Sequence, residues 1–124
     1  MITGRVTADR QIVIRMTIRG KNGRDQEVEA VLDTGFDGWL SLPSPLLAEL
    51  GFEWCRRGRA FLADGSKSVF DIYEGVVIWD GQPCRVPIHA ADVTPLVGMS
   101  LLDGYEISIQ MRPSGKVTIR RLTS

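Results

Sequence analysis

The chain of 124 residues is long enough for a single hydrophobic core, so we expect one domain over residues 1–124. Its 15 Lys and Arg residues balance its 15 Asp and Glu residues, and this dispersed, neutral charge excludes the basic surface of a protein that binds nucleic acid or anionic membranes. Apolar residues make up 44% of the sequence and charged residues 24%, as in soluble globular proteins, and no apolar run is long enough to cross a bilayer.

At the amino terminus, Met1–Arg5 lacks the continuous apolar core of a signal peptide. We therefore expect a cytoplasmic protein that does not insert into membranes. Beyond this segment, apolar and polar residues alternate with a period of two, which predicts strands. The expected strands in this part of the chain are Gln11–Ile18, Glu27–Leu32 and Trp39–Leu42, with a hairpin turn at Lys21-Asn22-Gly23 between the first two.

One helix is expected directly after these strands, at Ser44–Leu50. Ser44 is expected to cap its amino terminus, Pro45 suits the first helical position, and Gly51 suits the position just past its end. The basic residues that follow, Arg56-Arg57-Gly58-Arg59, are interpreted as a solvated loop rather than a phosphate-binding site.

The second half of the chain again alternates with a period of two. The expected strands are Gly58–Leu62, Ser68–Tyr73, Glu74–Trp79, Arg85–Ala90, Thr94–Gly98, Tyr105–Met111 and Lys116–Arg120, with turns at Ala63-Asp64-Gly65-Ser66, Asp80-Gly81 and Pro113-Ser114-Gly115. Pro87 predicts an edge position or a bulge. Met99–Asp103 is long enough for one helical turn. These elements predict a mostly β chain with one or two short helices.

The cysteine and histidine residues predict no metal site and no cofactor. Cys55 and Cys84 do not form a CxxC pair, and His89 is the single histidine. In a reducing cytosol two such cysteines are expected to be free thiols. His89 is interpreted as a surface or edge residue.

An acid, a hydroxyl and a glycine, Asp33-Thr34-Gly35, stand between two apolar runs. Asp and Gly are common in turns, so the triplet alone is weak evidence of a site. A surface turn, however, rarely has Ala-Val-Leu before it and Phe-Asp-Gly-Trp-Leu after it. A buried acid fits better, because Val31 and Leu32 supply apolar surroundings that exclude water. The Thr34 hydroxyl can hold the loop by a hydrogen bond, and Gly35 allows a close approach of backbone.

These residues resemble the active-site loop of retropepsin-like aspartic proteases, and two further segments match in order. Pro95-Leu96-Val97-Gly98 resembles the element that crosses behind that loop, and Met99–Leu102 resembles the short helix that follows. The hairpin that carries Ala63–Ser66 stands where the family has its flap. The resemblance covers about residues 11 to 120 and is strongest to small single-domain bacterial members, whose loops read Asp-Thr-Gly-Phe and continue into Leu-Pro.

The resemblance implies an all-β fold, a closed acid-protease barrel with one or two short helices, and the activity of an aspartic endopeptidase on peptide or protein substrates. It implies a catalytic role for Asp33, Thr34 and Gly35, and substrate-binding roles for Phe36, Asp37, Ala63, Asp64, Gly65 and Ser66. Phe36 departs from viral members and pepsins, which carry a small residue there, so its ring is expected to fill the nearest substrate pocket and to restrict the range of substrates. Phe61 and Phe70 flank the hairpin turn and fit cross-strand packing as well as substrate contact.

Aspartic protease chemistry needs two carboxylates, and this chain supplies one Asp-Thr-Gly. Asp103-Gly104 lacks both the hydroxyl residue and the apolar lead. A symmetric homodimer would bring Asp33 against its own equivalent. The alternative is a non-catalytic dimerisation or peptide-binding module with this fold; the intact triplet favours the enzyme, because paired buried acids cost stability and a module without chemistry has no need of them.

Overall fold

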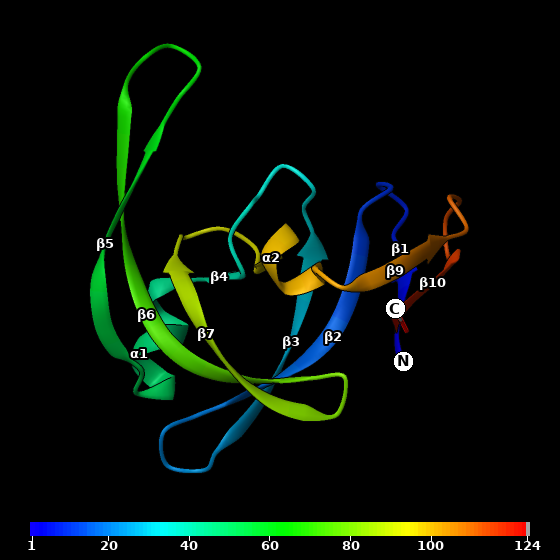
Figure 1. The fold of residues 1–124 in the computed structure, drawn as a ribbon, viewed down its shortest axis with the longest axis horizontal. Coiled ribbons are helices and arrows are strands. Elements are labelled where there is room, and N and C mark those ends of the chain that lie inside the picture. The colour runs from blue at the N-terminus through cyan, green and yellow to red at the C-terminus, as the bar shows by residue number, and fades with distance from the viewer. Residues whose placement is uncertain (124) are drawn as a thin grey trace.

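The computed structural model describes residues 1–123, and these residues form ten strands and two short helices (Figure 1). The strands are β1 (Ile2–Val6), β2 (Ile12–Arg19), β3 (Asp25–Leu32), β4 (Leu40–Leu42), β5 (Glu53–Phe61), β6 (Lys67–Trp79), β7 (Gln82–Ala90), β8 (Leu96–Val97), β9 (Tyr105–Ile109) and β10 (Lys116–Arg121). The helices are α1 (Ser44–Leu50) and α2 (Met99–Leu102). In the described residues, neither helix is long and apolar enough to cross a membrane.

All ten strands belong to one sheet, in the order β5-β6-β7-β4-β8-β3-β2-β1-β10-β9. A further pairing joins the end of β2 to β6, with Ile18 opposite Val77, and it closes the central strands into a ring. Most neighbours are antiparallel; β3 with β8 and β4 with β7 are parallel. The expected all-β, closed barrel with short helices is therefore confirmed.

The core lies on one face of the strands that surround β8. Leu32, Val97, Leu40 and Ile88 stand side by side across β3, β8, β4 and β7, and all four are buried. Successive side chains of a strand point to opposite faces. The next row, on the other face, is therefore Val31, Leu96, Ser41, His89 and Ile72. Asp33 follows β3 on this second face.

Helix α1 spans the expected residues, but the Ser44 cap is wrong. Pro43 occupies the capping position and Ser44 is already helical, so Pro45 falls at the second helical position. The Ser44 N–H donates to Asp92 Oδ1 at 3.1 Å, so a carboxylate from a distant loop satisfies the helix start in place of the serine hydroxyl. Gly51 ends the helix in the left-handed conformation, as expected.

The interpretation of Arg56–Arg59 as a loop is also wrong. These residues lie in β5, which pairs with β6 from Glu53 to Phe61. The long β6 offers hydrogen-bonding groups along all of β5, and a register shift between Trp54 and Arg56 interrupts the alternation that would mark a strand in the sequence.

Two other elements differ from expectation or refine it. Strand β1 was not predicted; it lies between β2 and β10, so its pairing depends on both ends of the chain. Pro87 has a strand neighbour on one side only, because β7 pairs there with Glu74 of β6 while the pairing with β4 begins at Ile88. The expected edge position of Pro87 is confirmed.

Candidate active site

The Asp33 loop begins where β3 ends and is fixed from its inner side. The Asp33 N–H donates to the Val97 carbonyl at 3.0 Å, which extends the β3–β8 pairing by one residue. Asp33 Oδ1 accepts from the Gly35 N–H at 2.9 Å, so the carboxylate shapes its own loop. Asp33 is half-buried, whereas Thr34 and Gly35 are exposed. The loop therefore presents its acid and hydroxyl on an open surface of the single chain.

The segment from β8 into α2 crosses behind residues 33–39, as the family resemblance implies. Most of the hydrogen bonds between the two segments are made by backbone groups, and the Ser100 side chain adds one more. Besides the bond from Asp33 to Val97, four hydrogen bonds join the two segments: Gly98 N–H to Trp39 O at 3.0 Å, Met99 N–H to Phe36 O at 2.8 Å, Ser100 N–H to Gly38 O at 3.1 Å, and Ser100 Oγ to Asp37 O at 2.6 Å.

Gly98 makes this crossing possible because it has no Cβ. A Cβ there would overlap the Gly38 carbonyl oxygen and would lie 2.8 Å from Phe36 Cδ2. Backbone atoms cannot move aside as a long side chain can. The glycine that ends Pro95-Leu96-Val97-Gly98 therefore has a packing reason, which is the close approach of two backbone segments.

The Phe36 ring turns toward the crossing and is half-buried. A Cβ built on Gly38 would lie 2.6 Å from Phe36 Cε1, so the ring covers Gly38 closely. The ring also makes a T-shaped contact with the His89 ring, with ring centroids 5.1 Å apart. Packing of this kind fixes the ring within the loop and leaves part of it at the surface.

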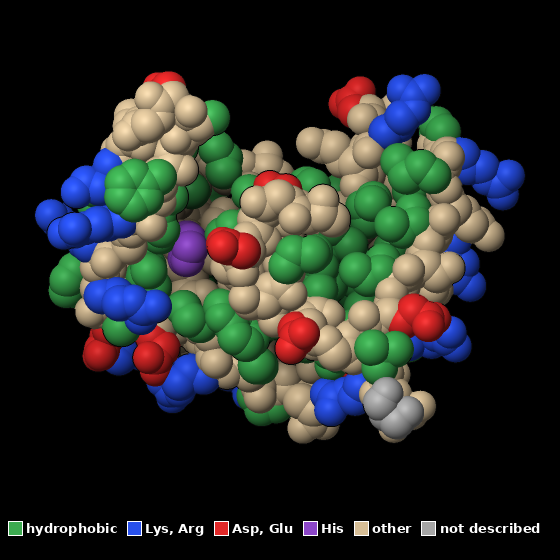
Figure 2. Space-filling view, turned by 45° about the horizontal axis from the view of Figure 1, so that its top comes forward, with side chains coloured by type: hydrophobic (Ala, Val, Ile, Leu, Met, Phe, Trp, Pro, Cys, Tyr) green, Lys and Arg blue, Asp and Glu red, His purple; other side chains and the backbone are tan. Residues whose placement is uncertain are grey.

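His89 is not at the edge of the sheet, although part of its ring reaches the surface (Figure 2). It lies in β7 where strands flank it on both sides, with Ser41 of β4 and Ile72 of β6 as neighbours, and it is half-buried. Its ring stacks on Phe70, with centroids 4.5 Å apart and planes at 25°. The sequence alone does not reveal this position, because it depends on the pairing of β4 with β7.

Burial controls the charge of this histidine. Desolvation of the half-buried ring lowers the pKa of His89 below that of an ordinary imidazole. The Asp37 carboxylate opposes the shift and the Arg56 guanidinium adds to it. Asp37 itself is exposed, and in the part of the chain that the structure describes its carboxylate has no ion-pair partner.

The β5–β6 hairpin projects on the side of the molecule that carries the Asp33 loop (Figure 1). Its turn, Ala63–Ser66, is exposed throughout. Asp64 Oδ1 accepts from the Ser66 N–H at 2.9 Å and from Ser66 Oγ at 2.6 Å, and these hydrogen bonds lower the pKa of Asp64. Figure 2 shows the surface hollowed between this hairpin and the opposite side of the molecule, with the single histidine beside an acidic side chain.

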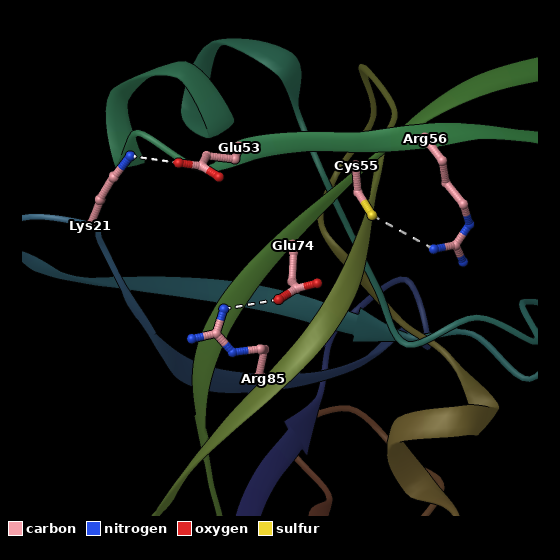
Figure 3. A network of polar contacts seen from close by, with 6 residues as sticks. All are labelled: Lys21, Glu53, Cys55, Arg56, Glu74 and Arg85. Carbon is pink, nitrogen blue, oxygen red and sulfur yellow. Dashed lines mark hydrogen bonds and ion pairs between the residues drawn. The ribbon is translucent and has the colours of Figure 1, made fainter.

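A cavity of about 490 Å³ lies elsewhere, and none of the predicted site residues lines it. Its charged residues are matched in pairs: Lys21 Nζ lies 2.9 Å from Glu53 Oε1, and Arg85 lies 2.9 Å from Glu74 (Figure 3). The exposed Cys55 lines it as well, and Cys55 and Cys84 are both free. Among the described residues, no three His, Cys, Asp or Glu side chains are placed to bind a metal.

No protein-family model matches the sequence, and no curated protein sequence matches it. The structure is similar to the crystal structure of a retropepsin-like aspartic protease from Rickettsia conorii, with a TM-score of 0.58 and 17% sequence identity. The alignment covers 98% of this chain and 89% of that chain. The likeness extends over nearly the whole chain and includes the closed sheet that carries the Asp33 loop. The protein therefore has a retropepsin-like fold.

Proposed function

We propose that the protein is a homodimeric aspartic endopeptidase, in which Asp33 from each of two chains activates one water molecule. The observation that carries the proposal is the position of Asp33. Its loop is fixed from behind by backbone hydrogen bonds, while Thr34 and Gly35 face solvent in the single chain. A half-buried acid on a loop whose neighbouring residues are exposed suits a site that a second copy completes, because one chain supplies one of the two carboxylates required.

In this mechanism the two Asp33 carboxylates lie close enough that they share one proton, because like charges at short range cannot both ionise. The ionised carboxylate accepts a proton from water as the water oxygen attacks the scissile carbonyl carbon. The protonated carboxyl donates its proton to the carbonyl oxygen. The carboxyl that took the proton from water then donates it to the leaving nitrogen, and one hydroxyl of the tetrahedral intermediate returns its proton to the other carboxylate. The C–N bond breaks as the intermediate collapses, which gives an acid and an amine and restores the shared proton.

The other predicted site residues take supporting roles in the proposal. Thr34 hydrogen-bonds across the two chains, Gly35 allows close approach, and Phe36 and Asp37 contact the substrate beside the loop. The β5–β6 hairpin acts as a flap whose Ala63–Ser66 turn closes over the peptide. Phe61, close to this turn, is 80% exposed, and such an apolar side chain suits contact with a peptide or with the second chain.

Subunit mixing tests the shared site. Asp33→Asn keeps the shape of the side chain but cannot accept a proton, so the variant should lose at least about 100-fold in activity. The probe is a set of unstructured peptides, with cleavage read by mass spectrometry. After exchange with an equal amount of Asp33→Asn chains, about half of the wild-type chains pair with a variant chain. Activity per wild-type chain should then fall to about half.

Three outcomes separate the hypotheses. Unchanged activity after verified exchange would show that each chain works alone and would overturn the shared site. Wild-type activity in Asp33→Asn itself would assign the chemistry to another residue. A dimer that binds the peptides without cleaving them would favour the non-catalytic module.

A further inference from the structure

A line of aromatic rings connects the β5–β6 hairpin with the Asp33 loop. Phe70 of β6 lies over Gly58, its partner in β5; a Cβ on Gly58 would be 2.7 Å from Phe70 Cζ. The other side of Phe70 stacks on His89, at 4.5 Å between centroids. His89 in turn makes a T-shaped contact with Phe36, at 5.1 Å between centroids. Each ring comes from a different segment, so the line joins the hairpin, β7 and the loop.

Both ends of this line are anchored. Phe36 is one residue beyond the Asp33-Thr34-Gly35 triplet; its N–H donates to the Asp33 carbonyl at 3.1 Å and its carbonyl accepts from Met99 at 2.8 Å. Phe70 belongs to the paired stem of the hairpin, nearer the barrel than the exposed turn. A displacement of His89 would therefore move the stem relative to the acid.

His89 is the titratable member of the line. Asp37 from the loop and Arg56 from β5 are the charged groups that act on it, whereas its strand neighbours Ser41 and Ile72 are uncharged. A neutral imidazole stacks on a phenyl ring without losing much hydration, but an imidazolium must give up water to remain between two rings.

We infer that His89 is a positioning residue that holds the stem of the β5–β6 hairpin against the Asp33 loop, and that protonation of its ring loosens this connection. The hairpin is then most firmly held at neutral pH and becomes more mobile under acidic conditions. The inference rests on the proposed function only where it assigns the hairpin the role of a flap; the connection itself is a property of the fold.

Hydrogen exchange tests the connection without any need for activity. Protection factors for the amides of residues 58–70 are measured from about pH 5 to pH 8, the range in which histidine titrates. The His89 imidazole resonance is followed over the same range. The hairpin between β2 and β3 serves as the internal control, because its turn lies away from the ring line. As the pH is lowered, we expect the protection of residues 58–70 to fall several-fold, with the same midpoint as the imidazole titration. The control hairpin should show no such step.

Two variants separate stacking from charge. His89→Phe keeps an aromatic ring that cannot titrate, so protection should stay high and the pH step should vanish. His89→Gln removes the ring, so protection should be reduced at every pH. If His89→Phe destabilises the fold, Phe70→Leu breaks the line from the hairpin side and should reproduce the loss seen in His89→Gln. A pH step that persists in His89→Phe, or full protection in His89→Gln, would overturn the inference.

Kinetics then relate the connection to catalysis. In an active enzyme, His89→Phe should flatten the acidic limb of the pH profile of KM and leave the Asp33-dependent limb of kcat in place. If the chain cleaves no peptide but shows the exchange step, the proposed function fails and the connection stands. If it cleaves peptides and residues 58–70 show no step, the connection fails and the proposed function stands.

Discussion

Two regions of this protein differ in how they use polar groups. The cavity beside β2, β5 and β6 is rich in charge, yet its Lys21, Glu53, Glu74 and Arg85 are joined in exposed pairs (Figure 3). The Asp33 loop has few charged groups, but its backbone is bonded to β8 and α2 and its acid is held in a fixed position. Surface charges that are already paired within the chain need no ligand to neutralise them. An acid held on a rigid, open loop is the arrangement suited to chemistry.

The contrast also appears in the expected energies. An exposed ion pair contributes little, because water screens both charges and two flexible side chains must be ordered. Close backbone packing tolerates almost no added volume. Substitutions in the loop crossing should therefore have much larger effects than substitutions in the cavity, although the cavity has more charged side chains.

The largest effect on stability is expected for Gly98→Ala. The new Cβ would overlap the Gly38 carbonyl, so the crossing must shift, and the free energy of unfolding should fall by about 3 kcal/mol. Urea denaturation measures the loss. Gly23→Asn is the control, because a Cβ at Gly23 meets open space and Asn tolerates its positive φ; its effect should be within about 0.5 kcal/mol. Similar stabilities of the two variants would contradict the packing role of Gly98.

Ser100→Ala should have a smaller effect in the same region. It removes the hydrogen bond that Ser100 Oγ donates to the Asp37 carbonyl, worth about 1 kcal/mol. Residues 36–38 should also exchange their amide hydrogens faster. The exposed Ser108 on β9 provides the matched control, Ser108→Ala. A loop that exchanges as in the wild type would show that this hydroxyl does not fix it.

Ser41→Ala is expected to act in the opposite direction. Among the described residues, the buried Ser41 Oγ has no hydrogen-bond partner, so the folded state bears the cost of its desolvation. Its removal should leave stability unchanged or raise it by up to about 1 kcal/mol. Thermal and urea unfolding check the sign. A clear loss of stability would mean that the hydroxyl is satisfied in solution.

The smallest effect is expected in the cavity. Arg85 and Glu74 have side chains that are 71% and 47% exposed, so a double-mutant cycle of Arg85→Gln and Glu74→Gln should give a coupling energy of at most about 0.5 kcal/mol. Added salt should reduce it further. A coupling as large as the loss in Gly98→Ala would reverse the comparison between the two regions.

Acidic pH should lower stability through His89. Its pKa is lowered in the folded state, so the unfolded chain binds a proton more readily. The contribution of His89 to the free energy of unfolding is therefore complete above the ordinary imidazole pKa. It should be lost as the pH falls through that pKa and then through the lower pKa of the folded state. Urea denaturation at several pH values measures this, and the contribution should be absent in His89→Phe.

Local features of the sequence predicted much of this fold. Period-two alternation located most strands, and Pro45 with Gly51 located α1. Local features failed where a distant segment supplied the decisive contact. Asp92 replaced Ser44 at the helix start, and the long β6 made a strand of the arginine-rich segment. Strand β1 needed β10, from the other end of the chain.

Most of the elements, the apolar lead into Asp33 and the single Asp-Thr-Gly can be identified from the chain alone, because they depend on neighbouring residues. The contact of Gly98 with Gly38, the inward turn of Phe36 and the position of His89 between two rings appear only in the folded protein. Those contacts join segments that are far apart in the chain, and they follow from the order of strands in the sheet. Alternation assigns a residue to a face of its strand, but only the strand order determines which residue lies beside it.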